Sequence, residues 1–370
     1  MARTSSGQLK VGLVGKRACA FVAGFRSMPQ TRITALCELD RALLDTLAER
    51  YAIPERYSDY EELLERGRPD IVVLGTPMHL HVPQAVAALA RHIHVLSEVT
   101  AAVSLEQCRE LVRAVRASRA TYMMAENYCY MKANVLVKSM VEHGLFGELY
   151  YAEGEYIHNV RHLHVDAQGN PTWRTIWQVG KRGCTYGTHS LGPILQWFNE
   201  RVVTVSCFGT GMRTEPKWNH DDTTLMLCQT ESGGLIKIRL DMLSPRPHNM
   251  AYYALQGTKG AYEAPRAPGE AHKVWLADYC EDPNRWRSLW DFEAEFLPEL
   301  WRNPPLEALH AGHGGGDYFI VRDFVQSILQ GTPPPIDVYR ALDFTVPGLI
   351  SEESIACGGV PLLVPDFREE

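Results

Sequence analysis

Two spacings of apolar residues alternate along the first third of the chain. Short runs that are apolar at nearly every position are separated by longer stretches in which apolar residues recur every three or four positions. The runs lie at residues 9–14, 32–37, 70–75, 93–97 and 122–125. Near-continuous apolar strands that alternate with helices are typical of a parallel sheet covered on both faces. The pattern predicts a doubly wound α/β fold, in which ligands bind beyond the carboxyl ends of the strands.

After residue 126 the spacing becomes that of an antiparallel sheet. A helix is expected at 133–143, and further apolar runs lie at residues 149–156, 202–208, 223–230, 235–242 and 251–256. The last turn before residue 235 reads Glu-Ser-Gly-Gly, which is a hairpin signal. We therefore predict a Rossmann-type dinucleotide-binding domain at residues 1–125. An α+β domain with an open, largely antiparallel sheet would follow at residues 126–370 and carry substrate binding and oligomerisation.

Composition excludes several classes of function. The chain has 370 residues, 45% of them apolar and 22% charged, as expected of two folded domains. Its net charge of −7 comes without a basic block, so nucleic acid is not an expected partner. The sequence contains no run of about 18 apolar residues, so no membrane span is predicted. Its first residues lack the apolar stretch of a secretory signal. The nine cysteines show no metal-ligand spacing, which favours reduced thiols in a cytoplasmic protein.

The turn after the first strand carries part of a dinucleotide fingerprint. It reads Gly15-Lys16-Arg17-Ala18-Cys19-Ala20, so only the first glycine of G-x-G-x-x-G is present. Arg17 stands where the backbone would approach a diphosphate, but Lys16 or Arg17 can contact phosphate by charge. Glu38, at the end of the second strand, suits the ribose hydroxyls of NAD. The turn predicts an NAD site or, alternatively, only a structural connection.

Polar residues at strand ends and in loops supply candidate chemistry. Glu126 follows an apolar strand, where a carboxylate can bind a sugar hydroxyl, ligate a metal, act as a base or form a buried ion pair. Tyr156 and His158 share one face of a strand. His162 and His164 lie in a loop and are expected to be solvated. Further candidates are Tyr186 and His189 before a helix, Arg246 and His248 around a proline, and His313 and Asp317 around a glycine run, where Asp317 could simply cap a helix.

Several segments together resemble the Gfo/Idh/MocA family of NAD(P)-linked sugar and inositol oxidoreductases. They are Gly75-Thr76-Pro77 with His79 and His81, His94-Val95-Leu96-Ser97-Glu98, and residues 105–115. The resemblance implies a Rossmann domain, an α/β domain with an open antiparallel sheet, and an active site between them. It also implies that Thr76, Pro77, His81 and Glu98 bind the cofactor.

Two neighbouring positions depart from the family's motif. The family places Glu-Lys-Pro after the fifth strand, and its lysine assists acid–base chemistry at the carbinol, whereas this chain has Glu98-Val99-Thr100. Valine can neither donate nor accept a proton. The departure argues against an ordinary sugar dehydrogenase that uses the usual lysine.

Other segments resemble a subgroup of the family, the NAD-dependent glycosidases such as α-N-acetylgalactosaminidases. They are residues 125–130, 144–148, 156–158, 172–174, 186–193, 246–249 and 313–318. In such enzymes NAD⁺ takes a hydride from C3 of the sugar, the C2 proton becomes acidic, and the group at C1 is eliminated. The resemblance implies catalytic roles for Tyr156, Tyr186, His189 and Glu126. It implies substrate binding by His158, Arg174, Arg246, His248, His313 and Asp317.

Two other functions remain open alongside NAD-linked redox chemistry on a sugar or glycoside. One is a non-redox hydrolase, lyase or isomerase on the same scaffold, in which Glu126, His158, His189 and His313 hold a divalent metal such as Mn or Zn. The other is a catalytically silent member that binds a ligand. In each case we expect a small-molecule carbohydrate ligand and, by analogy with relatives, a homodimer or homotetramer.

Overall fold

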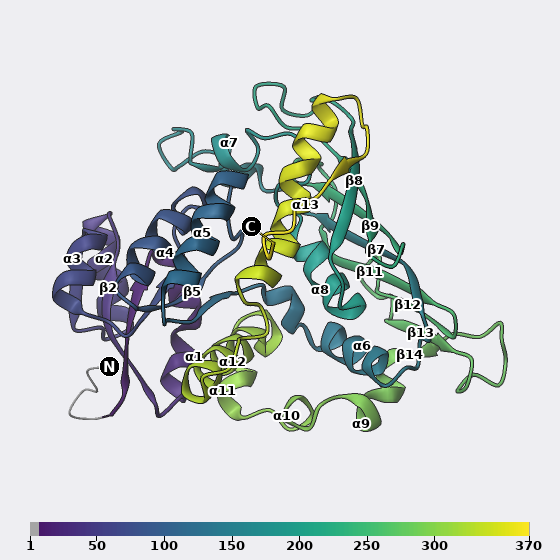
Figure 1. Cartoon of the computed structure of the whole chain (residues 1–370), viewed down its shortest axis with the longest axis horizontal. Coiled ribbons are helices and arrows are strands. Elements are labelled where there is room, and N and C mark those ends of the chain that lie inside the picture. The colour runs from purple at the N-terminus through teal and green to yellow at the C-terminus, as the bar shows by residue number, and fades with distance from the viewer. Residues whose placement is uncertain (1–6, 370) are drawn as a thin grey trace. The chain divides into compact units, whose positions relative to one another are not determined.

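The computed structural model describes residues 7–369, which fold as two compact units (Figure 1). Unit 1 comprises residues 7–130, 305–342 and 367–369, and unit 2 comprises residues 131–304 and 343–366. Helix α13 (Val338–Ala356) begins in unit 1 and continues in unit 2. Among residues 7–369, no helix has the length and apolar character needed to cross a membrane.

Unit 1 is built on a six-stranded parallel sheet, which confirms the predicted doubly wound fold. The strand order is β3-β2-β1-β4-β5-β6, and every pairing is parallel. The strands are β1 (Leu9–Val14), β2 (Thr31–Cys37), β3 (Glu55–Tyr57), β4 (Ile71–Leu74), β5 (His94–Ser97) and β6 (Tyr122–Met124). The order reverses between β1 and β4, and in such sheets ligands bind at this point, outside the carboxyl ends of the strands.

Two of the helices that cover this sheet, α2 and α5, begin at side-chain caps, and each buries one apolar stripe. Asp40 accepts a hydrogen bond from the Leu43 amide at the start of α2, and Ser104 accepts one from the Gln107 amide at the start of α5. The helical segments of the first 130 residues are η1 (Lys16–Phe21), α1 (Val22–Ser27), α2 (Arg41–Arg50), α3 (Tyr60–Glu62), η2 (Leu63–Gly67), η3 (Met78–Leu80), α4 (His81–Ala90), α5 (Leu105–Ala117) and η4 (Asn127–Tyr130).

Residues from far along the chain complete unit 1. Its later segments are α11 (Leu306–Leu309), η7 (His313–Gly315) and α12 (Gly316–Gln330). Helices α1 and α12 lie side by side (Figure 1), and a Cβ atom on Gly24 of α1 would lie 2.9 Å from the Val321 side chain. A Cβ atom on Gly316 would lie 3.0 Å from the Tyr130 carbonyl oxygen. The start of α12 therefore packs against η4, the segment that follows β6.

Unit 2 is built on a nine-stranded, mostly antiparallel sheet, as predicted. Its order is β14-β13-β12-β11-β7-β10-β9-β8-β15, and only the central β7–β10 pair is parallel. The predicted hairpin forms between β9 and β10. The strands are β7 (Leu149–Ile157), β8 (Val202–Gly209), β9 (Thr224–Thr230), β10 (Leu235–Asp241), β11 (Asn249–Gly257), β12 (Gly260–Glu263), β13 (Lys273–Leu276), β14 (Arg287–Ser288) and β15 (Leu362–Leu363).

One face of this sheet is covered by helix α8 (Thr188–Phe198). The approach is close, because a Cβ atom on Gly154 of β7 would lie 3.0 Å from Ser190 in α8. Trp197 of α8 donates a hydrogen bond to the Asn134 carbonyl oxygen of α6 (Lys132–Glu142), which packs beside α8. The remaining helical segments of unit 2 are η5 (Arg161–Leu163), α7 (Arg174–Trp177), η6 (Leu289–Phe292), α9 (Glu293–Phe296) and α10 (Glu299–Arg302).

Candidate active site

The turn after β1 packs tightly against the end of β4. Gly15 has a φ of +82°, and its amide donates a 2.9 Å hydrogen bond to the Cys37 carbonyl oxygen of β2. A Cβ atom on Gly15 would lie 2.7 Å from the Gly75 carbonyl oxygen. Only glycine suits both the positive φ and this close approach, which explains why the first glycine of the fingerprint remains.

Charged side chains replace the missing glycines along the carboxyl edge of the sheet. Glu38, after β2, accepts a 3.0 Å hydrogen bond from the Lys16 amide. The Nε atom of Arg17 donates a 2.8 Å hydrogen bond to Glu98, after β5. The Arg17 side chain is 48% exposed, whereas Glu98 is buried. A carboxylate suited to ribose hydroxyls and a cation suited to a diphosphate therefore follow neighbouring strands, and this donor set fits a dinucleotide.

His81 contacts the loops that follow β4 and β5, and Thr76 and Pro77 lie in the first of these loops. His81 is buried, and its ring nitrogens lie 2.8 Å from the Thr100 carbonyl oxygen and 2.9 Å from that of Thr76. Burial lowers the pKa of this imidazole, so it is neutral at pH 7 and one nitrogen donates at a time. Thr76 donates to Gln84, and Pro77 precedes η3. The contacts of His81 in this structure hold together the loops after β4 and β5.

Three more predicted residues of unit 1 lie at or near the end of β6. Glu126 follows this strand, is fully buried, and accepts a 3.2 Å hydrogen bond from the Tyr128 amide. His313 and Asp317 form a pair across the glycine run, with 2.9 Å between Nδ1 and Oδ1. Asp317 lies in the first turn of α12, the helix that packs against η4.

In unit 2 the predicted tyrosines and histidines gather into one cluster of rings. The centroid of Tyr156 lies 5.2 Å from that of His189 and 5.9 Å from that of Tyr186, and the last two are 5.3 Å apart. His158 extends the cluster, with its ring 4.5 Å from that of His248. Tyr156 and His158 come from the end of β7, Tyr186 and His189 from the entry to α8, and His248 from the segment before β11. These five side chains form what we call the ring cluster.

The ring cluster contains a hydroxyl–imidazole pair whose proton can be placed. The Tyr156 hydroxyl and His158 Nδ1 are 2.9 Å apart. Burial, reinforced by the neighbouring His248, His162, Arg174 and His189, lowers the pKa of His158 to about 4. At neutral pH the imidazole therefore carries no charge, and its Nδ1 can accept the Tyr156 proton while Nε2 carries the hydrogen.

The two predicted arginines differ in their surroundings. Arg174 is stacked on the Trp173 ring at 4.5 Å and donates a 2.7 Å hydrogen bond to Gln178. Its positive charge adds to burial, the main cause, in lowering the pKa of His158. Arg246 lies exposed on the loop between β10 and β11. The structure thus associates Arg174, but not Arg246, with the ring cluster.

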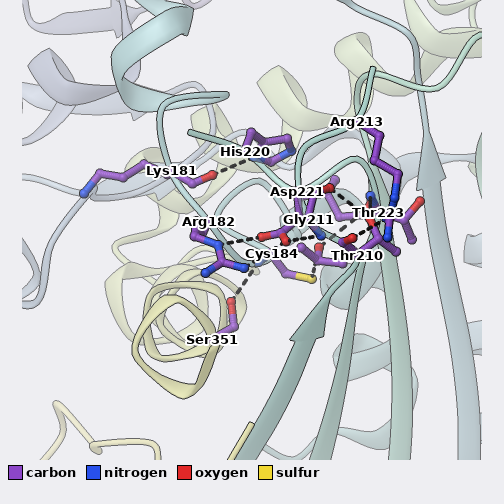
Figure 2. Close-up of polar contacts among 12 residues, drawn as sticks. Lys181, Arg182, Cys184, Thr210, Gly211, Arg213, His220, Asp221, Thr223 and Ser351 are labelled. Carbon is purple, nitrogen blue, oxygen red and sulfur yellow. Dashed lines mark hydrogen bonds and ion pairs between the residues drawn. The ribbon is translucent and has the colours of Figure 1, made fainter. Parts of the chain in front are cut away.

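The segment that leads into Tyr186 is held by contacts of Lys181, Arg182 and Cys184 (Figure 2). The Lys181 carbonyl oxygen lies 2.6 Å from His220 Nδ1, and Arg182 donates two 3.0 Å hydrogen bonds to Asp221. The Cys184 amide donates a 2.8 Å hydrogen bond to Ser351 of α13. The segment before Tyr186 is thereby attached to the loop before β9 and to α13.

The Asp221 carboxylate is the centre of these contacts. It is fully buried, and it also accepts a 2.8 Å hydrogen bond from the Gly211 amide (Figure 2). Burial raises the pKa of this carboxyl, but the Arg182 guanidinium and the Gly211 amide outweigh that effect and hold the pKa below its usual value. The charged form therefore persists inside the protein.

Sequence reasoning missed this support and was wrong about His164. Arg182, His220 and Asp221 were not predicted, although the run His220-Asp221-Asp222 directly before a strand was a usable signal. His164, expected to be solvated, is buried, and its ring lies 6.0 Å from that of Trp218. Burial and the neighbouring His220 lower the pKa of His164 to about 4.

The metal alternative receives no support from the described part of the chain. Among residues 7–369, no three His, Cys, Asp or Glu side chains are arranged so that they could hold a metal ion. His158 and His189 lie in the ring cluster of unit 2, whereas Glu126 and His313 belong to unit 1.

Replacing Arg182 by Gln should destabilise the protein by about 2 kcal/mol, because the Asp221 carboxylate stays buried without its cation. The estimate is below that for a fully buried pair, since Arg182 itself is 37% exposed. Urea unfolding measures the change, and Arg285→Gln, at an exposed position, is the matched control. Equal unfolding free energies for the two variants would contradict the assigned role.

The lowered pKa values of His158 and His164 predict a loss of stability in acid. Above about pH 6.5 both rings are neutral in the folded and unfolded states. As pH falls towards 4 the unfolded chain binds protons first, so the unfolding free energy should fall by roughly 1 kcal/mol per pH unit. Urea unfolding between pH 7 and 4.5 measures this slope. His164→Phe should flatten it and His310→Gln, at an exposed site, should not; an unchanged slope in His164→Phe would refute the assignment.

Comparison with known families covers almost the whole chain. Residues 9–126 match the model of the GFO_IDH_MocA oxidoreductase family, described as an NAD-binding Rossmann fold. Residues 130–210 and 210–370 match the model of the glycosyl hydrolase 109 C-terminal domain. A glycosyl hydrolase family 109 protein of Streptomyces filamentosus is 32% identical, with 97% of this chain and 77% of that protein covered. One of Solibacter usitatus (strain Ellin6076) is 29% identical, with 98% and 89% covered.

Solved structures share the fold. A levoglucosan dehydrogenase in complex with NADH and levoglucosan has a TM-score of 0.81 and 20% identity, with 97% of this chain and 100% of that chain covered. An oxidoreductase domain protein from Kribbella flavida has a TM-score of 0.80 and 20% identity, with 97% and 99% covered. The family models and the curated relatives together confirm the resemblance drawn from the sequence. The chain belongs to glycosyl hydrolase family 109 within the Gfo/Idh/MocA oxidoreductases, and it is a carbohydrate-active enzyme with NAD as its cofactor.

Proposed function

We propose that this protein cleaves a glycosidic bond through transient oxidation of the sugar. The observation that carries the proposal is the ring cluster, in which a tyrosine hydroxyl is hydrogen-bonded to a neutral histidine and lies against a second tyrosine–histidine pair. Bound NAD supplies the acceptance and return of a hydride at one ring carbon, which makes the neighbouring C–H acidic while the carbonyl exists. The protein must then move protons at two positions.

Tyr156 is assigned the removal of the proton from carbon. Its hydroxyl can pass its own proton to His158 Nδ1, 2.9 Å away, and so become the base. Burial keeps the His158 imidazole neutral, so Nδ1 is available to accept the hydrogen bond from Tyr156. The Arg174 guanidinium, whose charge reaches His158, stabilises the negative charge that develops on the enolate oxygen.

Tyr186 and His189 are assigned proton donation to the leaving group. Elimination requires a proton donor at the glycosidic oxygen, and both side chains border Tyr156. His189 is buried in the first turn of α8, and its carbonyl oxygen accepts a 2.6 Å hydrogen bond from Tyr253, which fixes this turn. Sugar hydroxyls are assigned to His248, a member of the ring cluster, and to Arg246, two residues before it.

The cofactor contacts follow from the carboxyl edge of unit 1. Glu38 would hold the adenosine ribose and repel a 2′-phosphate, so NAD is favoured over NADP. Lys16 and Arg17 would bind the diphosphate by charge, in place of the glycine amides of the usual turn. Gly15, Thr76, Pro77, His81 and Glu98 would shape the same edge.

Two measurements test the reaction. Denatured protein should release about one NAD(H) per chain and no stoichiometric metal. Cleavage of 4-nitrophenyl glycosides, α-N-acetylgalactosaminide among them, in heavy water should place deuterium at C2 of the released sugar, because that hydrogen is exchanged during elimination. Cleavage without deuterium would identify a direct hydrolase, and steady accumulation of NADH from free sugars would identify a simple dehydrogenase. Either result would overturn the proposal.

Substitutions test the residues. Tyr156→Phe and His189→Ala should each lower kcat by about 100-fold or more, since each removes a proton carrier. Unfolding midpoints should stay close to that of the wild type, and Tyr150→Phe, at an exposed position of the same strand β7, should keep full activity. Undiminished turnover in both variants would remove the assigned site.

The outer face of the unit 2 sheet supports the expected self-association. In β9 every second residue is exposed, yet two of these positions hold Leu225 and Leu227, and Phe208 of the neighbouring β8 is 57% exposed. An exposed apolar sheet face of this kind is typical of an interface. We assign it to a second copy of the chain.

Sedimentation velocity should therefore show a dimer or tetramer that Leu227→Lys dissociates, because a lysine cannot be buried there without a partner charge. Leu39→Lys, at an exposed leucine of unit 1, should leave the mass unchanged. A monomeric wild-type protein would refute the assignment.

A further inference from the structure

The loop that leads into α12 has a strained backbone at its histidine. Three consecutive residues have positive φ: His313 at +53°, Gly314 at +66° and Gly315 at +99°. Glycine adopts this region freely, whereas a residue with a Cβ atom does so at a cost. Such residues persist where the surrounding structure holds them, and they are concentrated at active sites. His313 therefore merits a chemical explanation.

Asp317 holds the His313 ring in one orientation. Nδ1 of His313 lies 2.9 Å from Oδ1 of Asp317, whose side chain is 2% exposed. A carboxylate can only accept, so Nδ1 carries the hydrogen and Nε2 presents a lone pair. The His313 side chain is 30% exposed, which leaves the ring accessible. A base whose far nitrogen is fixed by a buried carboxylate is a recurrent catalytic arrangement.

The pair lies at the carboxyl edge of the parallel sheet. A Cβ atom on Gly316, between the two residues, would lie 3.0 Å from the Tyr130 carbonyl oxygen and 3.5 Å from that of Asn127. Asn127 directly follows Glu126, which lies two residues after the end of β6. The Asp317 carbonyl oxygen would lie 3.4 Å from a Cβ atom on Gly24 of α1, the helix that follows the cofactor turn. These contacts, all within unit 1, place the pair beside the edge where dinucleotides bind.

Oxidation of a carbinol at that edge needs a proton acceptor, and position 99 holds a valine. Glu98 is hydrogen-bonded to Arg17, and the Glu126 carboxylate is fully buried. We propose that His313, oriented by Asp317, is the general base for this step, an inference that rests on the proposed function. The O–H bond breaks and its proton goes to His313 Nε2, the C–H bond breaks and its hydride goes to NAD⁺, and the C–O bond becomes a carbonyl. Reduction reverses both transfers.

The test compares His313→Ala with His310→Ala, an exposed histidine three residues earlier in the same connection. With a 4-nitrophenyl glycoside that the wild type cleaves, His313→Ala should lower kcat by about 100-fold or more at unchanged KM. Free imidazole in the buffer should restore part of the loss. NAD⁺ binding, titrated by tryptophan fluorescence, should match the wild type. His310→Ala should behave as the wild type throughout.

Full turnover by His313→Ala would overturn the inference while the proposed function stands. The same holds for a loss of turnover that imidazole does not rescue and that is matched by weaker NAD⁺ binding. A wild type that releases no NAD(H) and cleaves no glycoside would instead refute the proposed function, and with it the catalytic role.

A second measurement needs no turnover. Diethyl pyrocarbonate acylates a neutral imidazole nitrogen, and mass spectrometry follows His313 and His310 in the same sample. Asp317→Ala should slow acylation of His313 and leave His310 unchanged, because no acceptor then fixes the lone pair on Nε2. Equal rates at His313 in both proteins would show that Asp317 does not orient the ring.

Discussion

Parallel pairing of all six strands is the constraint on which unit 1 depends. Because every strand runs the same way, each connecting loop leaves from one edge, and residues separated by many positions become neighbours there. Gly15, Glu38, Glu98 and Glu126 follow four of these strands. Local sequence need only end each strand with a suitable polar residue, and the sheet brings those residues to a common edge.

Unit 2 brings its candidate side chains together in a different way. Its ring cluster draws on a strand end, a helix entry and a loop, so no single periodicity collects the side chains. Buried polar contacts hold the segments that carry these side chains. The charge of Asp221 is stable inside the protein because Arg182 and the Gly211 amide hydrogen-bond to it, and the same contact fixes the backbone that leads to Tyr186. This support holds the segment that places the Tyr186 ring against those of Tyr156 and His189.

The features that could be predicted from sequence are those with a short-range pattern. Apolar runs located the strands of both sheets, and the two-residue spacing of Tyr156 and His158 placed them on one face. The polar residues at strand ends followed from the same pattern. Residue types and motifs also identified Tyr186 and His189. Arg182 and Asp221, by contrast, are 39 positions apart and share no periodicity, and His164 looks like any polar loop residue until the loop is folded over it.

Unit 1 is discontinuous in the chain. Residues 305–342 belong to it, although they follow every strand of the second sheet except β15 in the sequence. On the ribosome, the cofactor-side unit therefore lacks α12 until nearly the whole polypeptide has emerged, and the groove on α1 that Val321 fills stays open to water during that time. Contacts between residues so distant in sequence make assembly slow compared with a self-contained domain. Final closure of this sheet's helical layer is thus coupled to completion of synthesis, and a chain cut short before residue 305 would leave an apolar surface for chaperones or proteases to recognise.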